Sequence, residues 1–254
     1  MKAHIFLAHP EPQSFNGQLA KLSRQSVEEA GGTATLSDLY QMGFDPSEGA
    51  VHYNLRKDEA RFHVQTEQRF NAEQGALPPE VLAEVERIEA SDLLIVHFPL
   101  WWFGMPAILK GWMDRVFVYG RMYRSLARYD KGVCAGKRMI ACVTTRASAD
   151  NCAFNGREED TRLHLWPILL PFRYLCFSVH EPQIFHGVGG VAFMEGNEDG
   201  LSTIDVCSRQ WSEALTTLSD RRFVPYNRDE DFDPETKHLL PSAPSYSPFV
   251  RQEE

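Results

Sequence analysis

Apolar residues along this chain form short continuous runs, which are separated by longer segments with helical spacing. The continuous runs have the length of buried strands, which we predict at residues 2–8, 33–39, 92–98 and 137–145, with a fifth near 176–184. Apolar positions three and four residues apart predict helices at 14–30, 78–90, 106–118 and 202–218, and one more at about 59–74 within a polar excursion over 45–76. Strands that alternate with helices indicate an α/β protein with a doubly wound parallel sheet and helices on both faces.

The first predicted helix carries signals at both of its ends. Ser14 is a suitable N-cap, because its side-chain oxygen can accept a hydrogen bond from a backbone N–H of the first turn. Gly31 and Gly32 follow the last periodic residue, where glycine readily adopts the left-handed backbone that ends a helix. These signals place the start of the helix directly after the loop that leaves the first strand.

Composition and charge narrow the classes of partner. Of 254 residues, 35 are acidic and 26 basic, which gives a formal net charge of −9. A nucleic acid or an anionic membrane would favour a basic face, so the charge argues against both as the main partner. No apolar run approaches the roughly 20 residues of a membrane span.

The cysteines and histidines add two further expectations. Five scattered cysteines without a C-x-x-C spacing favour a cytoplasmic location with reduced thiols. None of the nine histidines shows ligand spacing such as H-x-x-x-H, so no metal site is predicted. We expect one body over residues 1–220 and an extended tail over 221–254, rich in charge and proline, which packs on the body or on a partner subunit.

The most informative segment follows the predicted strand at 92–98. It reads Pro-Leu-Trp-Trp-Phe-Gly-Met-Pro over residues 99–106 and leads into a helix. Adjacent tryptophans on a strand point to opposite faces, so Trp101 and Trp102 cannot both enter one core. Ligands of open α/β sheets bind at the carboxyl ends of the strands, where this segment lies. We therefore predict a flat apolar wall for a planar ring, the alternative being a core segment rich in aromatics.

A second candidate site lies between the first strand and the first helix, over residues 9–16. Helix N-termini hold phosphates through free backbone N–H groups and the positive end of the helix dipole. Ser14 adds a hydroxyl there and His9 a donor, although a His-Pro turn and a serine cap also occur without any ligand. The loop matches neither G-x-G-x-x-G nor the P-loop pattern, which excludes the two standard nucleotide sites.

These two segments together resemble the NAD(P)H:quinone oxidoreductase (DT-diaphorase-like) family over roughly residues 1–220. The resemblance implies a flavodoxin-like fold with a five-stranded parallel sheet, a homodimer whose partner completes the flavin pocket, and NAD(P)H as electron donor. It implies FAD rather than FMN, because the hydroxyl- and glycine-rich FMN loop of flavodoxins is absent. The cofactor-binding residues that it implies are His9, Ser14, Phe15, Asn16, Pro99, Leu100, Trp101, Trp102, Phe103, Thr144, Thr145, Arg146 and Ala147.

The segment after the strand at 137–145 departs from the family pattern. We align this segment with the family pattern on Thr144-Thr145 and on the Leu-Trp-Pro at 165–167. In this alignment Arg146 and Ala147 stand where the family has two glycines. Cys152 and Glu158 stand where it has a tyrosine and a histidine that stabilise charge during hydride transfer. Arg146, Cys152 and Glu158 are therefore candidate catalytic residues. The alternatives are a solvated arginine, an inert cysteine and a surface glutamate that pairs with a neighbouring arginine.

The resemblance also implies an acceptor pocket, made from Trp102, Phe103, Tyr123 and Arg124. Arg121 and Arg128 lie in the same stretch as Tyr123, and three arginines favour an anionic substrate or a nicotinamide phosphate. Alternatively, these arginines pair with surface carboxylates.

The expected function is a two-step hydride transfer from NAD(P)H through FAD to a quinone or a related conjugated aromatic acceptor. The departures at residues 146, 152 and 158 leave two alternatives. One is a flavin reductase with a non-quinone acceptor in secondary metabolism or aromatic breakdown. The other is a non-catalytic regulatory subunit that binds flavin or nicotinamide.

Overall fold

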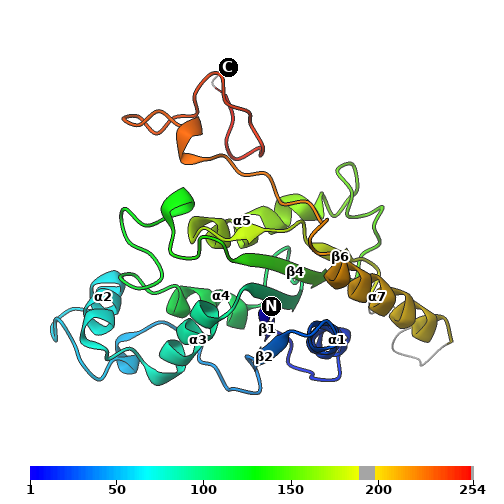
Figure 1. The fold of residues 1–254 in the computed structure, drawn as a ribbon, viewed down its shortest axis with the longest axis horizontal. Coiled ribbons are helices and arrows are strands. Elements are labelled where there is room, and N and C mark those ends of the chain that lie inside the picture. Colours follow the sequence, from blue (N-terminus) through cyan, green and yellow to red (C-terminus); the bar gives the residue numbers. More distant parts are fainter. Residues whose placement is uncertain (189–197, 253–254) are drawn as a thin grey trace.

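A parallel sheet forms the centre of the molecule (Figure 1). The structure is a computed structural model that describes residues 1–188 and 198–252, with side chains of the last helix described from Ile204 onward. The strands are β1 (Lys2–Leu7), β2 (Thr33–Asp38), β3 (Leu93–Pro99), β4 (Arg138–Thr144), β5 (Ser178–Val179) and β6 (Gln183–Phe185). Their order is β2-β1-β3-β4-β5, and β6 also pairs with β4. The flavodoxin-like α/β fold expected from the sequence is confirmed.

The predicted fifth strand is divided into two short pieces. β5 pairs with Arg138 and Met139 at the start of β4, whereas β6 pairs with residues from Cys142 to Thr144 at its end. Pro182 lies between the two pieces and has no N–H to donate to a ladder, which favours an interruption there. The strand β6 thereby comes beside the carboxyl end of β4.

Helices cover both faces of the sheet (Figure 1). On one face α1 (Phe15–Glu29) packs against α7 (Glu198–Thr216). On the other face lie α3 (Pro79–Ala90), α4 (Ala107–Val116) and α5 (Thr161–Tyr174). Alternate residues of β1 enter the two cores, with Ile5 on the side of α1 and Phe6 on the side of α3 and α4. The described residues contain no helix long and apolar enough to cross a bilayer.

The helix α5 was not expected from the sequence. It contains Pro167 and Pro171, and a proline inside a helix removes a backbone hydrogen bond and clashes with the preceding turn. The two prolines lie four residues apart, so they share one helix face, and Pro167 is exposed. The opposite face buries Leu165, Ile168 and other apolar side chains in the core, and this packing holds the helix despite its prolines.

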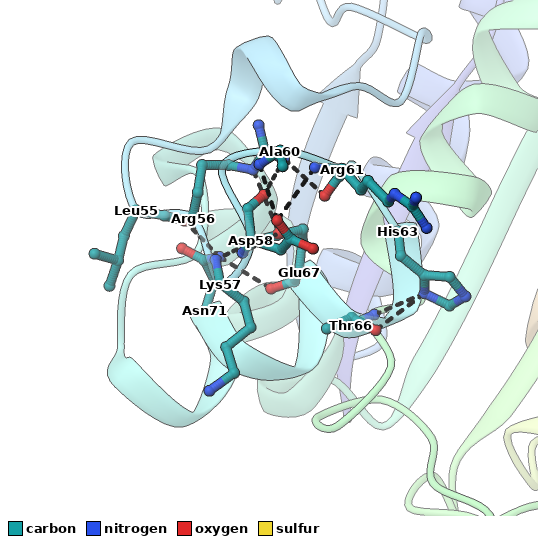
Figure 2. A network of polar contacts seen from close by, with 10 residues as sticks. All are labelled: Leu55, Arg56, Lys57, Asp58, Ala60, Arg61, His63, Thr66, Glu67 and Asn71. Atoms are coloured by element: carbon teal, nitrogen blue, oxygen red, sulfur yellow. Dashed lines mark hydrogen bonds and ion pairs between the residues drawn. The ribbon is translucent and has the colours of Figure 1, made fainter.

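The polar excursion folds around a buried carboxylate on α2 (Val64–Gln74) (Figure 2). Glu67 is fully buried and accepts hydrogen bonds from the backbone N–H groups of Lys57 (2.8 Å) and Asp58 (3.2 Å). The Arg56 guanidinium lies 3.3 Å from the same carboxylate. The predicted helix around residues 59–74 begins only at Val64, because the His63 ring accepts from the Thr66 N–H and caps the helix there.

The tail leaves the body along β5. The Val224 N–H donates to the Val179 carbonyl at 2.8 Å, and Phe223 forms an isolated bridge with His180. The Arg173 side chain of α5 donates to the Asn227 carbonyl and pairs with Asp130. Beyond these contacts the tail forms the uppermost part of the view in Figure 1, coloured orange to red.

Candidate functional site

Three loops meet at the carboxyl edge of the sheet, after β1, β3 and β4. The His9 ring lies 5.8 Å from the Trp101 ring, which joins the first loop to the second. The Asn16 side-chain amide donates to Thr144 Oγ1 at 2.8 Å, which joins the first loop to the end of β4. The segments that the sequence singled out are therefore neighbours in space, at the edge where open α/β sheets bind ligands.

The first loop presents the N-terminus of α1. Ser14 Oγ accepts from the Gly17 N–H at 3.1 Å, as predicted for an N-cap, and its hydroxyl proton stays available to a ligand. His9 Nδ1 lies 3.0 Å from the Glu11 N–H and 3.1 Å from the Glu11 carbonyl oxygen; where it accepts from the N–H, Nε2 of the neutral ring carries the proton and is a donor. A helix N-terminus with two adjacent side-chain donors is a suitable site for a phosphate group.

Asn16 connects this loop to the interior of the edge. Its side chain is buried, and Oδ1 has no hydrogen-bond partner among the described residues. A buried polar atom without a partner is costly, and such atoms in folded proteins are usually paired with protein, water or ligand. Asn16 Oδ1 is therefore a candidate acceptor for a donor group of a bound molecule.

The aromatic segment forms a tight turn. Trp101 and Gly104 exchange both backbone hydrogen bonds, at 2.9 and 3.0 Å. The two central residues have positive φ, 50° for Trp102 and 59° for Phe103, which is uncommon for bulky side chains. The turn leaves Trp102 97% exposed and Phe103 51% exposed. The expectation that at least one tryptophan faces away from the core is confirmed.

The loop after β4 is held by side chains on two sides. Thr145 Oγ1 donates to the Ala147 carbonyl at 2.9 Å and lies 3.2 Å from His186 Nδ1. The Leu100 N–H donates to the Thr144 carbonyl at 2.8 Å, which ties the start of the aromatic segment to the same loop. Pro99 pairs with Thr144 in the sheet. Thr144 and Thr145 are both buried, whereas Arg146 is exposed.

The three candidate catalytic residues have different surroundings. The Arg146 guanidinium is exposed, and none of the described residues forms an ion pair or hydrogen bond with it. Cys152 is buried, and its backbone bonds to Ser148 and Thr161. Glu158 is half-buried and forms no ion pair with either neighbouring arginine in the described part of the chain.

Tyr123 and Arg124 lie in a different cluster within one chain. The Tyr123 ring is 5.5 Å from the Tyr174 ring, and its hydroxyl accepts from Gln65 Nε2 of α2 at 3.1 Å. Arg124 donates to the Gly120 carbonyl at 2.8 Å. Arg121 pairs with Glu89, which confirms the surface-pair alternative for that arginine. Among the described residues, no hydrogen bond, ion pair or ring contact joins this tyrosine cluster to Trp102 or Phe103.

Comparison with known proteins decides the family. The model of the flavodoxin-like fold family Flavodoxin_2 matches residues 1–205. The NAD(P)H dehydrogenase [quinone] 1 of Cavia porcellus is 38% identical over 191 residues, which cover 74% of this chain and 69% of that protein. This chain belongs to the NAD(P)H:quinone oxidoreductase family.

Two further relatives extend the comparison across the family. The ribosyldihydronicotinamide dehydrogenase [quinone] of Homo sapiens is 36% identical and covers 72% of this chain and 80% of its own length. The crystal structure of a protein from Klebsiella pneumoniae assigned as a quinone reductase superposes with a TM-score of 0.85 at 29% identity and covers 95% of this chain and 94% of its own. As a member of this family, the chain is a flavoprotein oxidoreductase of the NAD(P)H dehydrogenase (quinone) type.

The residues at the edge fit a flavin. The exposed aromatic turn offers flat apolar surface, the N-terminus of α1 offers donors, and Asn16 Oδ1 lacks a partner among the described residues.

Two residues at the site were not predicted from the sequence. The His164 ring lies 5.0 Å from the Phe103 ring, and His186 contacts Thr145. His164 lies on α5, a helix that was not predicted because of its two prolines. His186 follows the interrupted fifth strand. Neither histidine therefore has a local sequence pattern that indicates a site.

Proposed function

We propose that this protein binds FAD at the carboxyl edge and transfers a hydride in two steps from NAD(P)H to a quinone or a related conjugated aromatic acceptor. The observation that supports this most is the exposed aromatic turn at residues 101–104 beside the donors of the first loop. FAD, when bound, supplies the ring that takes up and passes on the hydride.

The loops after β1, β3 and β4 contact different parts of the cofactor. His9, Ser14 and the first turn of α1, which includes Phe15, hold the phosphates of the cofactor. Leu100 to Phe103 orient its ring and exclude water from one side, and alignment of donor and acceptor is what hydride transfer mainly needs. Residues 144–147 face the polar edge of the ring.

Arg146 is the catalytic residue that we favour. Its guanidinium is exposed on the loop after β4 and unpaired among the described residues, so it is free to stabilise negative charge that develops at this edge. Glu158 is a second candidate, as a proton acceptor. Cys152 is buried and thus less accessible to substrate than either.

We further propose a homodimer in which Tyr123 and Arg124 reach the acceptor side of the partner's site. Within one chain these residues cluster with Tyr174 instead of the aromatic turn. Trp102 and Leu126 are almost fully exposed, at 97% and 88%. In the dimer, the partner subunit covers both side chains.

The proposed function is tested by visible absorption of the purified protein under anaerobic conditions. We expect flavin bands that bleach within seconds of adding NADH or NADPH and return on adding menadione. Bands that persist with both donors would favour the regulatory alternative. Failure to take up FAD or FMN on reconstitution would contradict the proposal.

The Gln65→Leu variant tests the role of Tyr123. Gln65 Nε2 holds the Tyr123 hydroxyl at 3.1 Å, and the loss of one such bond costs about 1 kcal/mol. We expect KM for menadione to rise by about three- to tenfold, because the tyrosine loses its orientation, while the bleaching rate with NAD(P)H stays unchanged. The control is Gln25→Leu, which removes an exposed hydrogen bond to Glu29 on α1. An unchanged KM in Gln65→Leu would exclude Tyr123 from the acceptor pocket.

A further inference from the structure

A cavity of about 810 Å³ lies beside the loop after β4, whose Cys152 helps to line it, and away from the loops after β1 and β3. Its walls come from residues 149–154, the first turns of α5, β6 and the tail. Neither His9, Asn16 nor Trp101 lines it. Its volume is within the range of about 300–1,000 Å³ that is typical of small-molecule sites.

Flat and apolar side chains make up much of this wall. Trp166 and Leu169 contribute from α5, and Tyr246 contributes from the tail. Phe154 also lines the cavity and is 86% exposed. Aromatic walls of this kind favour a planar ring as ligand.

The charged residues of the lining balance one another. Asp160 and Glu181 are acidic, and Arg162 and Arg221 are basic. Arg221 is already engaged, because its guanidinium donates to the carbonyls of Glu181 (2.6 Å) and Pro182 (2.8 Å) and to Gln183 Oε1 (3.2 Å). A lining without excess charge, in which the half-buried Arg221 is satisfied by protein acceptors and Arg162 is solvent-exposed, favours an uncharged ligand.

His186 provides one hydrogen-bond acceptor in the lining. The single proton of the Thr145 hydroxyl goes to the Ala147 carbonyl, so Thr145 Oγ1 must accept from His186 Nδ1–H. The lone pair of the neutral ring is then on Nε2. Burial lowers the pKa of His186, which keeps the ring neutral near pH 7. Nε2 has no partner among the described residues and is not buried from solvent.

We propose that this cavity binds an uncharged, planar aromatic molecule with a hydroxyl group, a phenol, whose O–H donates to His186 Nε2 while its ring lies against Trp166. The hydroquinone that the proposed reaction releases is such a phenol. The inference rests on the proposed function only for this choice of ligand. Because His186 also bonds to Thr145, the bound phenol is linked through this histidine to the loop after β4.

The first test uses two probes on the wild-type, flavin-loaded protein in isothermal titration calorimetry. 2-Naphthol has the ring and the donor, whereas 2-methoxynaphthalene has the ring without the donor. We expect 2-naphthol to bind at one site and at least about fivefold more tightly, the effect of one hydrogen bond. Equal affinity for the two probes, or no binding of 2-naphthol at millimolar concentration, overturns the proposal.

Variants then locate the site. His186→Phe should weaken 2-naphthol about tenfold and abolish the difference between the probes, and Ala153→Trp should fill the cavity and remove binding. His52→Phe, which changes a histidine outside the lining, is the matched control and should leave the affinity unchanged. If Trp102→Ala removes binding while His186→Phe and Ala153→Trp retain it, the phenol occupies the flavin edge and the proposal is wrong. That outcome leaves the proposed function intact, because the absorption test does not depend on the cavity.

Discussion

Glu84→Leu is expected to reduce the free energy of unfolding by about 3–5 kcal/mol, the usual effect of removing one partner from a buried charged network. Glu84 is fully buried on α3 and accepts from Ser37 Oγ at 2.8 Å and from Trp112 Nε1 at 3.0 Å. It also pairs with Arg87, and His4 Nε2 lies 3.8 Å away. Leucine would remove the acceptor of the buried Ser37 and Trp112 donors. Urea denaturation monitored by circular dichroism measures the change.

The control for this prediction is Glu86→Leu on the same helix, where the side chain is exposed. A surface substitution of this kind changes stability by about 0.5 kcal/mol or less. Equal effects of the two substitutions would contradict a stabilising role for the buried network.

The pH dependence of the Glu84 contribution follows from its pKa. Burial by itself raises the pKa, but the nearby His4 ring and the hydrogen bonds from Ser37 and Trp112 outweigh burial, and the net pKa lies below the ordinary 4.5. The folded state therefore binds this proton less readily than the unfolded chain, so the contribution is present above about pH 4.5 and is lost as the pH falls through the lowered pKa. The stability difference between wild type and Glu84→Leu should shrink in that acidic range.

Gly17→Ala is expected to weaken FAD binding by about ten- to a hundredfold. A Cβ at Gly17 would lie 2.1 Å from the Pro12 carbonyl oxygen and 2.8 Å from its carbon, and these are backbone atoms of the first loop. The loop must move to relieve the clash, and overpacking of this kind costs about 1–3 kcal/mol. His9 and the N-terminus of α1 would then no longer face the cofactor together. Fluorescence titration of the apoprotein with FAD measures the effect.

Gly49→Ala is the matched control for Gly17→Ala. Its backbone is extended, with φ of −175°, and a Cβ there would meet only Val51 Cγ1 at 4.0 Å. We expect wild-type FAD affinity in this variant. Unchanged FAD affinity in Gly17→Ala as well would show that the first loop does not position the cofactor.

The sequence by itself determined the elements whose signals are local. Four strands appeared as apolar runs, and the start of α1 followed from Ser14, because a cap acts within three residues of itself. That at least one of Trp101 and Trp102 lies outside the core was also predictable, but the positive-φ turn that leaves Trp102 97% exposed was not. The parallel sheet followed from the alternation of strands and helices, and its carboxyl edge indicated the site.

Tertiary structure alone decided the contacts between distant segments. Asn16 and Thr144 are 128 positions apart and meet only because β1 and β4 end at the same edge. The helix α5 forms against its own prolines because the core buries its inner face, and no local pattern reports that packing. Packing of distant segments also brings His164 and His186 to the site. It likewise places Tyr123 away from the aromatic turn. Propensity and spacing act over a few residues, whereas burial depends on the whole fold, so the elements followed from the sequence and the neighbours of each site residue from the packing.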